Sequence, residues 1–310
     1  MRIIFWGTPD FAVPSLRALL GEGFDVVAVV TQPDRPHGRS RSRLVPPPVK
    51  AVALEEELAV LQPESPSSEE FVTELSHIEH DLGVVVAYGH ILKKQVLELP
   101  LQGMVNVHAS LLPALRGAAP IEYAILEGYA ETGVTIMQMA ERMDAGSVIH
   151  QVSTPIATDE TGGELTVRMA EIGALALVEG LALFAAGVAE ILPQDDSMAT
   201  FAPKISRELA QIQWTESCDR IARKARAFDP RPGSWTRHKG TELKLFGPRP
   251  ADEFASDGDP GQVIETDPAF VVATADGALQ FLDVQPAGRP RMAAADWLRG
   301  RGAVHGDRFD

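Results

Sequence analysis

The sequence predicts an α/β domain with a parallel sheet, followed by a small β-barrel domain. Three observations support this fold class. The first thirty or so residues read as strand, helix and strand, which is a βαβ unit. An apolar run at 83–89 is typical of a central parallel strand. After residue 203, short strand-like runs separated by turns take the place of long helices.

The elements of the first domain follow from local signals. Strands are expected at 2–5 and 25–30, around a helix at 15–20 with Pro14 in its first turn. A helix at 49–58 and a strand near Leu61 come next. Later strands are expected at 83–89, 104–108, 133–139 and 148–151, and a long Ala/Leu-rich helix at 165–189.

Residues 31–50 show no periodicity and many turn formers, so they are expected to form a long exposed loop. The loop holds four arginines close together, Arg35, Arg39, Arg41 and Arg43. Arginines clustered in an otherwise acidic domain indicate a phosphate contact. The alternative is a loop that is merely solvated.

The expected domains are 1–192, a linker at 193–207, and 208–310. The second domain begins with a basic helix at 217–227 and continues with strands at 243–246, 261–265, 270–274 and 279–284. Charge also divides the chain. Residues 1–203 hold 12 Lys+Arg and 27 Asp+Glu, a net charge of −15, whereas residues 204–310 hold 16 of each. An acidic half argues against indiscriminate nucleic-acid binding, which needs a large positive surface.

At 310 residues the chain is long enough for two domains. It contains no apolar run long enough to be a membrane span, and it begins with a strand pattern rather than a signal peptide. Cys218 is the single cysteine, which excludes an internal disulfide and a cysteine-built metal cluster. We therefore expect a cytoplasmic protein that binds no membrane.

Candidate catalytic residues occur at 104–108, where apolar and polar residues alternate. Asn106 and His108 then share one face of a strand. Asp144 follows a later strand, and we expect it to meet His108 because the ends of neighbouring parallel strands converge. An amide can hold an oxyanion, an imidazole can move protons, and a carboxylate can orient the imidazole. The alternative for His108 is a histidine satisfied within a half-buried strand.

Two other sites are weakly supported. The turn after the first strand is not GxGxxG, so a dinucleotide site lacks its phosphate loop. His77 and His80 are expected on one helix at i, i+3 spacing, but no third metal ligand is well spaced, which favours surface histidines.

The pattern Asn106-x-His108-x-Ser-Leu-Leu-Pro113, with the later Asp144, resembles the formyltransferases that use 10-formyltetrahydrofolate. Further motifs resemble the methionyl-tRNA formyltransferases in particular, and the similarity covers nearly the whole chain. These motifs lie at 7–11, 32–39, 48–50, 116–121, 131–139, 227–235 and 285–288.

The resemblance implies a doubly wound, Rossmann-like, mostly parallel sheet and a C-terminal barrel resembling an OB-fold. It implies that Asn106, His108 and Asp144 are catalytic, and that the loop arginines bind tRNA. The implied reaction moves the formyl group of 10-formyltetrahydrofolate to methionyl-initiator tRNA and needs no metal. The protein is expected to be a monomer. The implied folate site is lined by Ile91, Leu92, Ser110, Leu111, Leu112 and Pro113.

The chain departs from the family pattern at Lys93, Ala109, Ala114, Leu115 and Gln213. The sequence leaves two rival functions open. One is another folate-dependent formyltransferase, acting on a ribonucleotide or a nucleotide sugar, which would not need a second domain or an arginine loop. The other is a non-catalytic tRNA-binding module, which would not need the three candidate catalytic residues.

Overall fold

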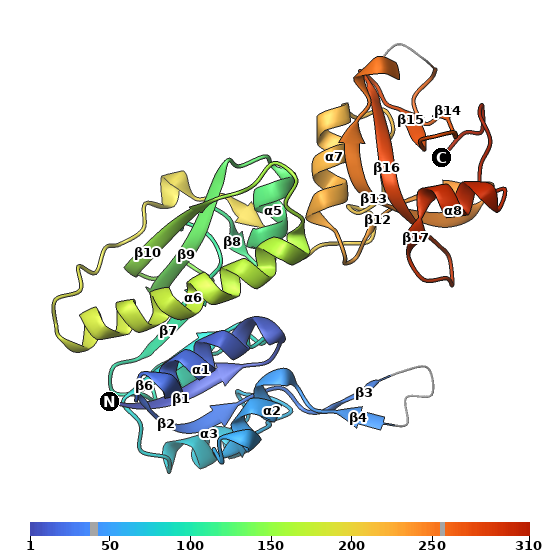
Figure 1. Ribbon diagram of the computed structural model, residues 1–310. Coiled ribbons are helices and arrows are strands. Elements are labelled where there is room, and N and C mark those ends of the chain that lie inside the picture. The colour runs from blue at the N-terminus through green and yellow to red at the C-terminus, as the bar shows by residue number, and fades with distance from the viewer. Residues whose placement is uncertain (38–42, 255–257) are drawn as a thin grey trace. The chain divides into compact units, whose positions relative to one another are not determined.

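The structure is a computed structural model that describes residues 1–37, 43–254 and 258–310 (Figure 1). The chain divides into two compact units. The N-terminal unit comprises Met1–Pro120, Glu131–Pro155 and Thr166–Ala202. The C-terminal unit comprises Ile121–Ala130, Ile156–Leu165 and Pro203–Asp310.

The N-terminal unit is built on a seven-stranded sheet in the order β10-β9-β7-β6-β1-β2-β5. The pairs β1–β2, β1–β6, β2–β5 and β6–β7 are parallel, whereas β9 is antiparallel to both β7 and β10. The predicted mostly parallel sheet is therefore confirmed. The strands are β1 (Arg2–Gly7), β2 (Asp25–Val30), β5 (Val60–Leu61), β6 (Leu82–Val86), β7 (Met104–His108), β9 (Glu131–Gln138) and β10 (Val148–Pro155).

Helices cover both faces of this sheet, as a doubly wound fold requires. On one face, α6 lies close to the strands, since a Cβ on Gly173 would be 3.2 Å from Val107. On the other face, Trp6 of β1 packs edge-on against Phe71 of α3. The helices of this unit are α1 (Val13–Gly21), α2 (Pro48–Glu55), α3 (Glu69–Ser76), α4 (Lys94–Leu97) and α6 (Gly162–Ala185), with short 3-10 helices at Asp10–Ala12 and Asp196–Met198.

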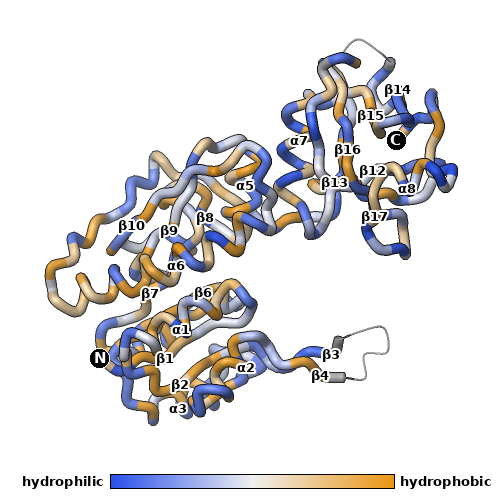
Figure 2. Tube along the Cα trace, in the orientation of Figure 1, coloured by the Kyte–Doolittle hydropathy of each residue, from blue (hydrophilic) through white to orange (hydrophobic). Residues whose placement is uncertain are grey.

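The buried strands are the most apolar parts of this unit, and β1 and β2 are coloured mainly as hydrophobic in Figure 2. Burial of these side chains, rather than local helix or strand preference, supplies most of the folding free energy. Within the part of the chain that the structure describes, no helix is both long and apolar enough to cross a membrane.

Several local predictions for the first domain were wrong, including the strand at 83–89, which ends at Val86, and the helix at 165–189, which ends at Ala185. The predicted loop at 31–50 contains a short antiparallel ribbon of β3 (Arg35–His37) and β4 (Arg43–Val45). His77 and His80 do not share a helix, because α3 ends at Ser76 and a carbonyl of the following turn accepts from His80. The helix predicted at 49–58 ends at Glu55, where a residue of positive φ, Glu57, follows.

The C-terminal unit contains an antiparallel sheet in the order β12-β13-β16-β15-β14, with β17 paired to β16. The last residues bridge both edges of this sheet, since Phe309 pairs with His238 at the end of β12 and Arg308 with Gln262 beside β14. This bridging supports the predicted barrel. The elements are α5 (Pro120–Leu126), α7 (Cys218–Ala227), β12 (Ser234–His238), β13 (Thr241–Pro250), β14 (Val263–Glu265), β15 (Val271–Ala273), β16 (Ala278–Pro286), β17 (Met292–Ala293) and α8 (Ala294–Arg299), with a 3-10 helix at Asp252–Phe254.

Candidate active site

Strand β7 carries two of the three predicted catalytic residues. Asn106 and His108 alternate with Val105 and Val107, so the polar and apolar pairs point to opposite faces of the sheet. Helix α6 covers the valine face. Asn106 is partly exposed and makes no side-chain hydrogen bond with the described residues. Its amide is therefore available to donate to a ligand.

The imidazole of His108 is buried between a carbonyl and a carboxylate. Its Nε2 lies 3.0 Å from the carbonyl oxygen of Leu115, and its Nδ1 lies 3.8 Å from Oδ2 of Asp144. Because a carbonyl can only accept, Nε2 carries a hydrogen, and the neutral ring has its lone pair on Nδ1. The separation from Asp144 is longer than a hydrogen bond. Nδ1 is therefore the ring atom that can take or give a proton, with a negative charge beside it.

Asp144 lies in the loop between β9 and β10 and has a positive φ of 51°. Its Oδ2 also accepts from the backbone N–H of Gly117 at 2.9 Å. The predicted proximity to His108 is found, but the predicted reason for it was wrong, since β9 runs antiparallel to β7. The chain leaves β9 beside the start of β7, where Met139 donates to the carbonyl of Met104 at 2.8 Å. The loop after β9, and not a shared edge of parallel strands, brings the carboxylate to the imidazole.

Hydrogen bonds hold the loop that follows His108. Ser110 donates from Oγ to the carbonyl of Ala114 at 2.6 Å. The N–H of Leu112 donates to Oγ1 of Thr135 at 3.0 Å, and Nε2 of Gln151 donates to the Leu112 carbonyl at 2.9 Å. The loop therefore has a defined backbone before any ligand binds. The four predicted folate-lining residues in it are Ser110, Leu111, Leu112 and Pro113, of which Ser110 and Leu112 are buried.

The two remaining predicted folate residues, Ile91 and Leu92, follow β6. Ile91 is 74% exposed, whereas Leu92 is 6% exposed and belongs to the core cluster that includes Tyr88. The side chain of Ile91 can contact a ligand, but Leu92 can offer only its backbone.

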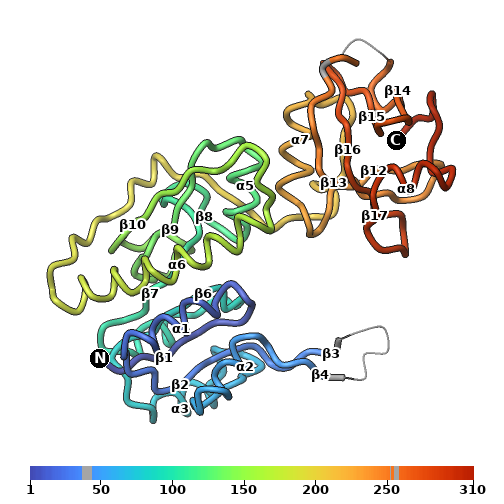
Figure 3. Tube along the Cα trace, in the orientation of Figure 1, coloured from blue at the N-terminus to red at the C-terminus, as the bar shows by residue number. Residues whose placement is uncertain are grey.

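Sequence reasoning missed the contribution of the segment after α6. This segment (yellow in Figure 3) pairs with β10 at Leu192 and forms β11 (Phe201–Ala202), which is parallel to β8 (Arg116–Gly117). Thr200 accepts from the N–H of Leu115 through its Oγ1 at 2.9 Å. Since the Leu115 carbonyl holds His108, the segment supports the imidazole through one intermediate residue. The predicted linker carried no motif that would signal this role.

A buried arginine joins the same segment to the Asp144 loop. Arg116 is 2% exposed, and its Nε and Nη2 donate to Oε1 of Gln194 at 3.0 and 2.7 Å. Its Nη1 donates to Asp196 at 2.8 Å, and hydrogen bonds from Arg142 and from Arg116 lower the pKa of Asp196. The Gln194 amide in turn donates to two backbone carbonyls of the loop that carries Asp144.

Of the four arginines predicted to bind tRNA, only Arg35 is described in full. It is exposed, and its guanidinium donates to Oε1 of Gln32. Arg39 and Arg41 lie outside the described residues, and only the backbone of Arg43 is described.

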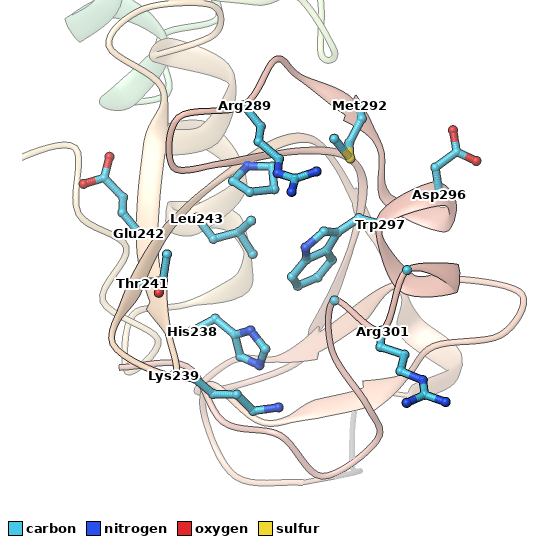
Figure 4. A pocket seen from close by; sticks show the side chains of 13 residues that line it. His238, Lys239, Thr241, Glu242, Leu243, Arg289, Met292, Asp296, Trp297 and Arg301 are labelled. Carbon is cyan, nitrogen blue, oxygen red and sulfur yellow. The ribbon is translucent and has the colours of Figure 1, made fainter.

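The C-terminal unit contains a cavity of about 480 Å³, shown in Figure 4. Trp297 of α8, Arg289, Arg301 and His238 are among its lining residues. His238 is paired with Asp307 at 3.0 Å, whereas Arg289 and Arg301 form no ion pair with any residue that the structure describes. None of the predicted catalytic residues lines this cavity.

The basic helix α7, drawn mainly as hydrophilic in Figure 2, uses its cations within its own unit. These contacts occupy the guanidinium and ammonium groups, so the helix is a poor candidate for RNA phosphates. The partners are Leu126 and Glu127 for Arg220, Asp219 for Arg223, Gln211 and Glu216 for Lys224, and Glu160 for Arg226.

Comparison with known proteins identifies the family of both parts. A family model described as formyl transferase matches residues 1–181, and one described as formyl transferase, C-terminal domain, matches residues 204–302. A methionyl-tRNA formyltransferase of Moorella thermoacetica is 46% identical over 308 residues, which are 99% of this chain and 98% of that protein.

Solved structures share the fold at lower identity. HypX from Aquifex aeolicus, in complex with tetrahydrofolic acid, has a TM-score of 0.65 at 22% identity; the match covers 96% of this chain and 47% of HypX. An N-formyltransferase from Helicobacter canadensis, in complex with folinic acid and dTDP-3-aminofucose, has a TM-score of 0.67 at 19% identity, covering 92% and 98% of the two chains. Together with the relative from Moorella, these findings confirm the resemblance seen in the sequence. The chain belongs to the formyl transferase family, in the group of the methionyl-tRNA formyltransferases.

Proposed function

We propose that this formyltransferase moves the formyl group of 10-formyltetrahydrofolate to the free amine of methionyl-initiator tRNA. The observation that carries the proposal is the 46% identity to a methionyl-tRNA formyltransferase over 99% of the chain. Two solved sugar N-formyltransferases share the fold at 19% and 16% identity, and identities this low show a common fold but give no support for a common substrate. We expect the protein to act in the cytoplasm as a monomer that binds no membrane.

The proposed chemistry uses three side chains. The amine nitrogen attacks the formyl carbon, and the amide of Asn106 donates to the oxygen as it becomes negative. Hydrogen bonds of this kind stabilise the transition state because the charge develops there. His108, charged through Nδ1, adds positive charge near that oxygen. The carboxylate of Asp144, 3.8 Å from Nδ1, stabilises the charged ring.

Completing the reaction requires a proton to move from the amine nitrogen to the leaving group. The amine nitrogen loses one proton as its bond to carbon forms, and N10 of the departing tetrahydrofolate gains one as its bond to carbon breaks. Since the Leu115 carbonyl holds Nε2 of His108, we assign both transfers to Nδ1. The charged ring gives its Nδ1 proton to N10, and the lone pair left on Nδ1, beside the Asp144 carboxylate, then takes the proton that the amine nitrogen loses. Ile91, the backbone at Leu92, and the loop of residues 110–113 would hold the folate.

We further propose that residues 1–192 form the catalytic domain, 193–207 a linker, and 208–310 a tRNA-binding domain. Two features support a tRNA partner. The sequence of an otherwise acidic unit carries four arginines within residues 35–43, and Arg289 and Arg301 line the cavity of the C-terminal unit without an ion pair to any described residue. Cations of this kind are what phosphate contacts require.

The test is formyl transfer by the purified protein from 10-formyltetrahydrofolate to four acceptors. These are initiator methionyl-tRNA, elongator methionyl-tRNA, a dTDP-amino sugar and an amino ribonucleotide. We expect N-formylmethionyl-tRNA from the initiator tRNA and far less product from the others. Faster transfer to the sugar or the ribonucleotide would replace the proposed substrate, and no consumption of the formyl donor with any acceptor would favour a non-catalytic binding module.

A further inference from the structure

We propose that Gln194, held by Arg116, is a positioning residue for formyl transfer. It fixes the backbone of the turn at Asp144–Gly146 so that the Asp144 carboxylate faces Nδ1 of His108. The inference rests on the proposed function, because formyl transfer is its main readout.

Every hydrogen-bonding group of the Gln194 amide is used. Nε2 donates to the carbonyl oxygen of Asp144 at 2.9 Å and to that of Gly146 at 2.7 Å. Oε1 accepts two N–H groups of Arg116, at 3.0 and 2.7 Å. The amide cannot be turned over, because its NH₂ group would then face a guanidinium and its oxygen would face two carbonyls. The contact therefore has one orientation.

The turn that Gln194 holds needs such support. Asp144 has a φ of 51°, a conformation that is uncommon for a residue with a side chain. The turn also lies close to β9, since a Cβ on Gly146 would be 1.8 Å from the carbonyl oxygen of Gln138. The position of the Asp144 carboxylate is therefore set by its own backbone, and Gln194 is the side chain that holds two of the carbonyls of that backbone.

Arg116 fixes Gln194 in the same way. The arginine is buried, and its own N–H is bound by the carbonyl of Thr200 at 2.9 Å. The next residue, Gly117, donates its N–H to the Asp144 carboxylate at 2.9 Å. Arg116–Gly117 thus contacts Asp144 by two routes, directly through the backbone of Gly117 and indirectly through Gln194.

The experiment is a double-mutant cycle of Gln194→Met with Asp144→Ala, measured as kcat for formylation of initiator methionyl-tRNA. Methionine keeps the length of the side chain and removes all four hydrogen bonds. We expect kcat to fall by up to about 100-fold, the effect of a misplacement near 1 Å, with KM for tRNA unchanged. In the Asp144→Ala background the same change should cost less than about twofold, because no carboxylate remains to be positioned.

Gln194→Glu provides a second variant for the case that Gln194→Met does not fold. It retains the contact with Arg116 but places an oxygen against the two carbonyls, so kcat should fall as for methionine. Asp195→Ala is the matched control, since Asp195 lies in the same segment but its side chain bonds, among the described residues, only to Ser197. Its kcat should equal that of the wild type.

A readout that needs no substrate separates the inference from the proposed function. The Gly117 amide should exchange with solvent faster in Gln194→Met and in Gln194→Glu than in wild type or Asp195→Ala. Unchanged Gly117 exchange, or a loss of kcat that is fully additive with Asp144→Ala, would overturn the positioning role. A wild-type protein inactive on methionyl-tRNA, but with the expected exchange pattern, would overturn the proposed substrate and leave the positioning of Asp144 supported.

Discussion

The surroundings of His108 and the β3–β4 ribbon differ in how their polar groups are held. At His108, the imidazole, the Asp144 carboxylate and the Arg116 guanidinium each have at least one close protein partner and are at most about one-sixth exposed. On the ribbon, Arg35 is exposed, and its guanidinium donates to the side chain of Gln32, three residues earlier. The base of the ribbon is tied down where Lys50 and Gln62 bind Asp34 at 2.8 Å.

This difference matches what the two regions are proposed to do. Transition-state stabilisation needs groups fixed before the reaction, so that no free energy is spent on reorienting them. Attraction of a polyanion needs only charge at the surface, and its strength depends on salt rather than on a fixed geometry. Substitutions near His108 should therefore change kcat, whereas substitutions on the ribbon should change tRNA affinity.

The largest effect is expected for Asn106→Ala. Loss of the amide removes an oxyanion donor and should lower kcat by about 10²- to 10³-fold, with little change in the affinity for tRNA. Single-turnover formylation and a tRNA binding titration measure the two quantities separately. A wild-type kcat would remove Asn106 from the mechanism.

His108→Ala should lower kcat by roughly 10²-fold or more, the scale of a lost acid–base group. Combined with Asn106→Ala, the two losses should be less than additive if the side chains act on the same transition state. The check is the kcat of both single variants and the double variant. Full additivity would show that the two residues act independently.

Replacing Arg39, Arg41 and Arg43 together by Ala should weaken tRNA binding. Each lost phosphate contact flattens the plot of log K against log salt by up to about one unit, so three contacts would change the slope by up to about three. A tRNA titration over a salt series tests this, and folate affinity serves as the control. If the slope of log K against log salt were identical to that of the wild type, these arginines would make no phosphate contact and the segment would be a solvated insertion.

The smallest effect is expected for Asp34→Asn at the base of the ribbon. Hydrogen bonds from Gln62, and then from Lys50, lower the pKa of Asp34. A carboxyl group whose pKa is lower in the folded state stabilises the fold at pH values above its pKa in the unfolded chain. This stability is lost as the pH falls through the pKa of the folded state. The difference in Tm between wild type and variant should therefore be present at neutral pH and vanish at acidic pH. A difference that grows on acidification would contradict the sign of this shift.

The elements that could be predicted are those whose signals are local. The strand β7 follows from its alternation, and β6 from its apolar run, so Asn106 and His108 were placed on one strand face without a structure. Asp144 was added to them from its place after a later strand, and the resemblance to the family agreed with that choice. Strand direction was not local information, which is why the antiparallel course of β9 was missed.

The support around the site could not be predicted for the same reason. Arg116 and Gln194 are 78 residues apart, and no spacing rule connects them. Leu115, a departure from the family pattern, holds His108 through its carbonyl, a group that every residue has. Departures at such positions leave the backbone contact intact.

Catalysis and tRNA capture are thus assigned to separate sets of residues. The most direct test is kcat for formylation at saturating tRNA and saturating 10-formyltetrahydrofolate, compared between His108→Ala and the triple variant of Arg39, Arg41 and Arg43. We predict a kcat at least about 100-fold below wild type for the first variant and a wild-type kcat with a raised KM for the second. A normal kcat in His108→Ala, or an equally large loss of kcat in the triple variant, would contradict the separation.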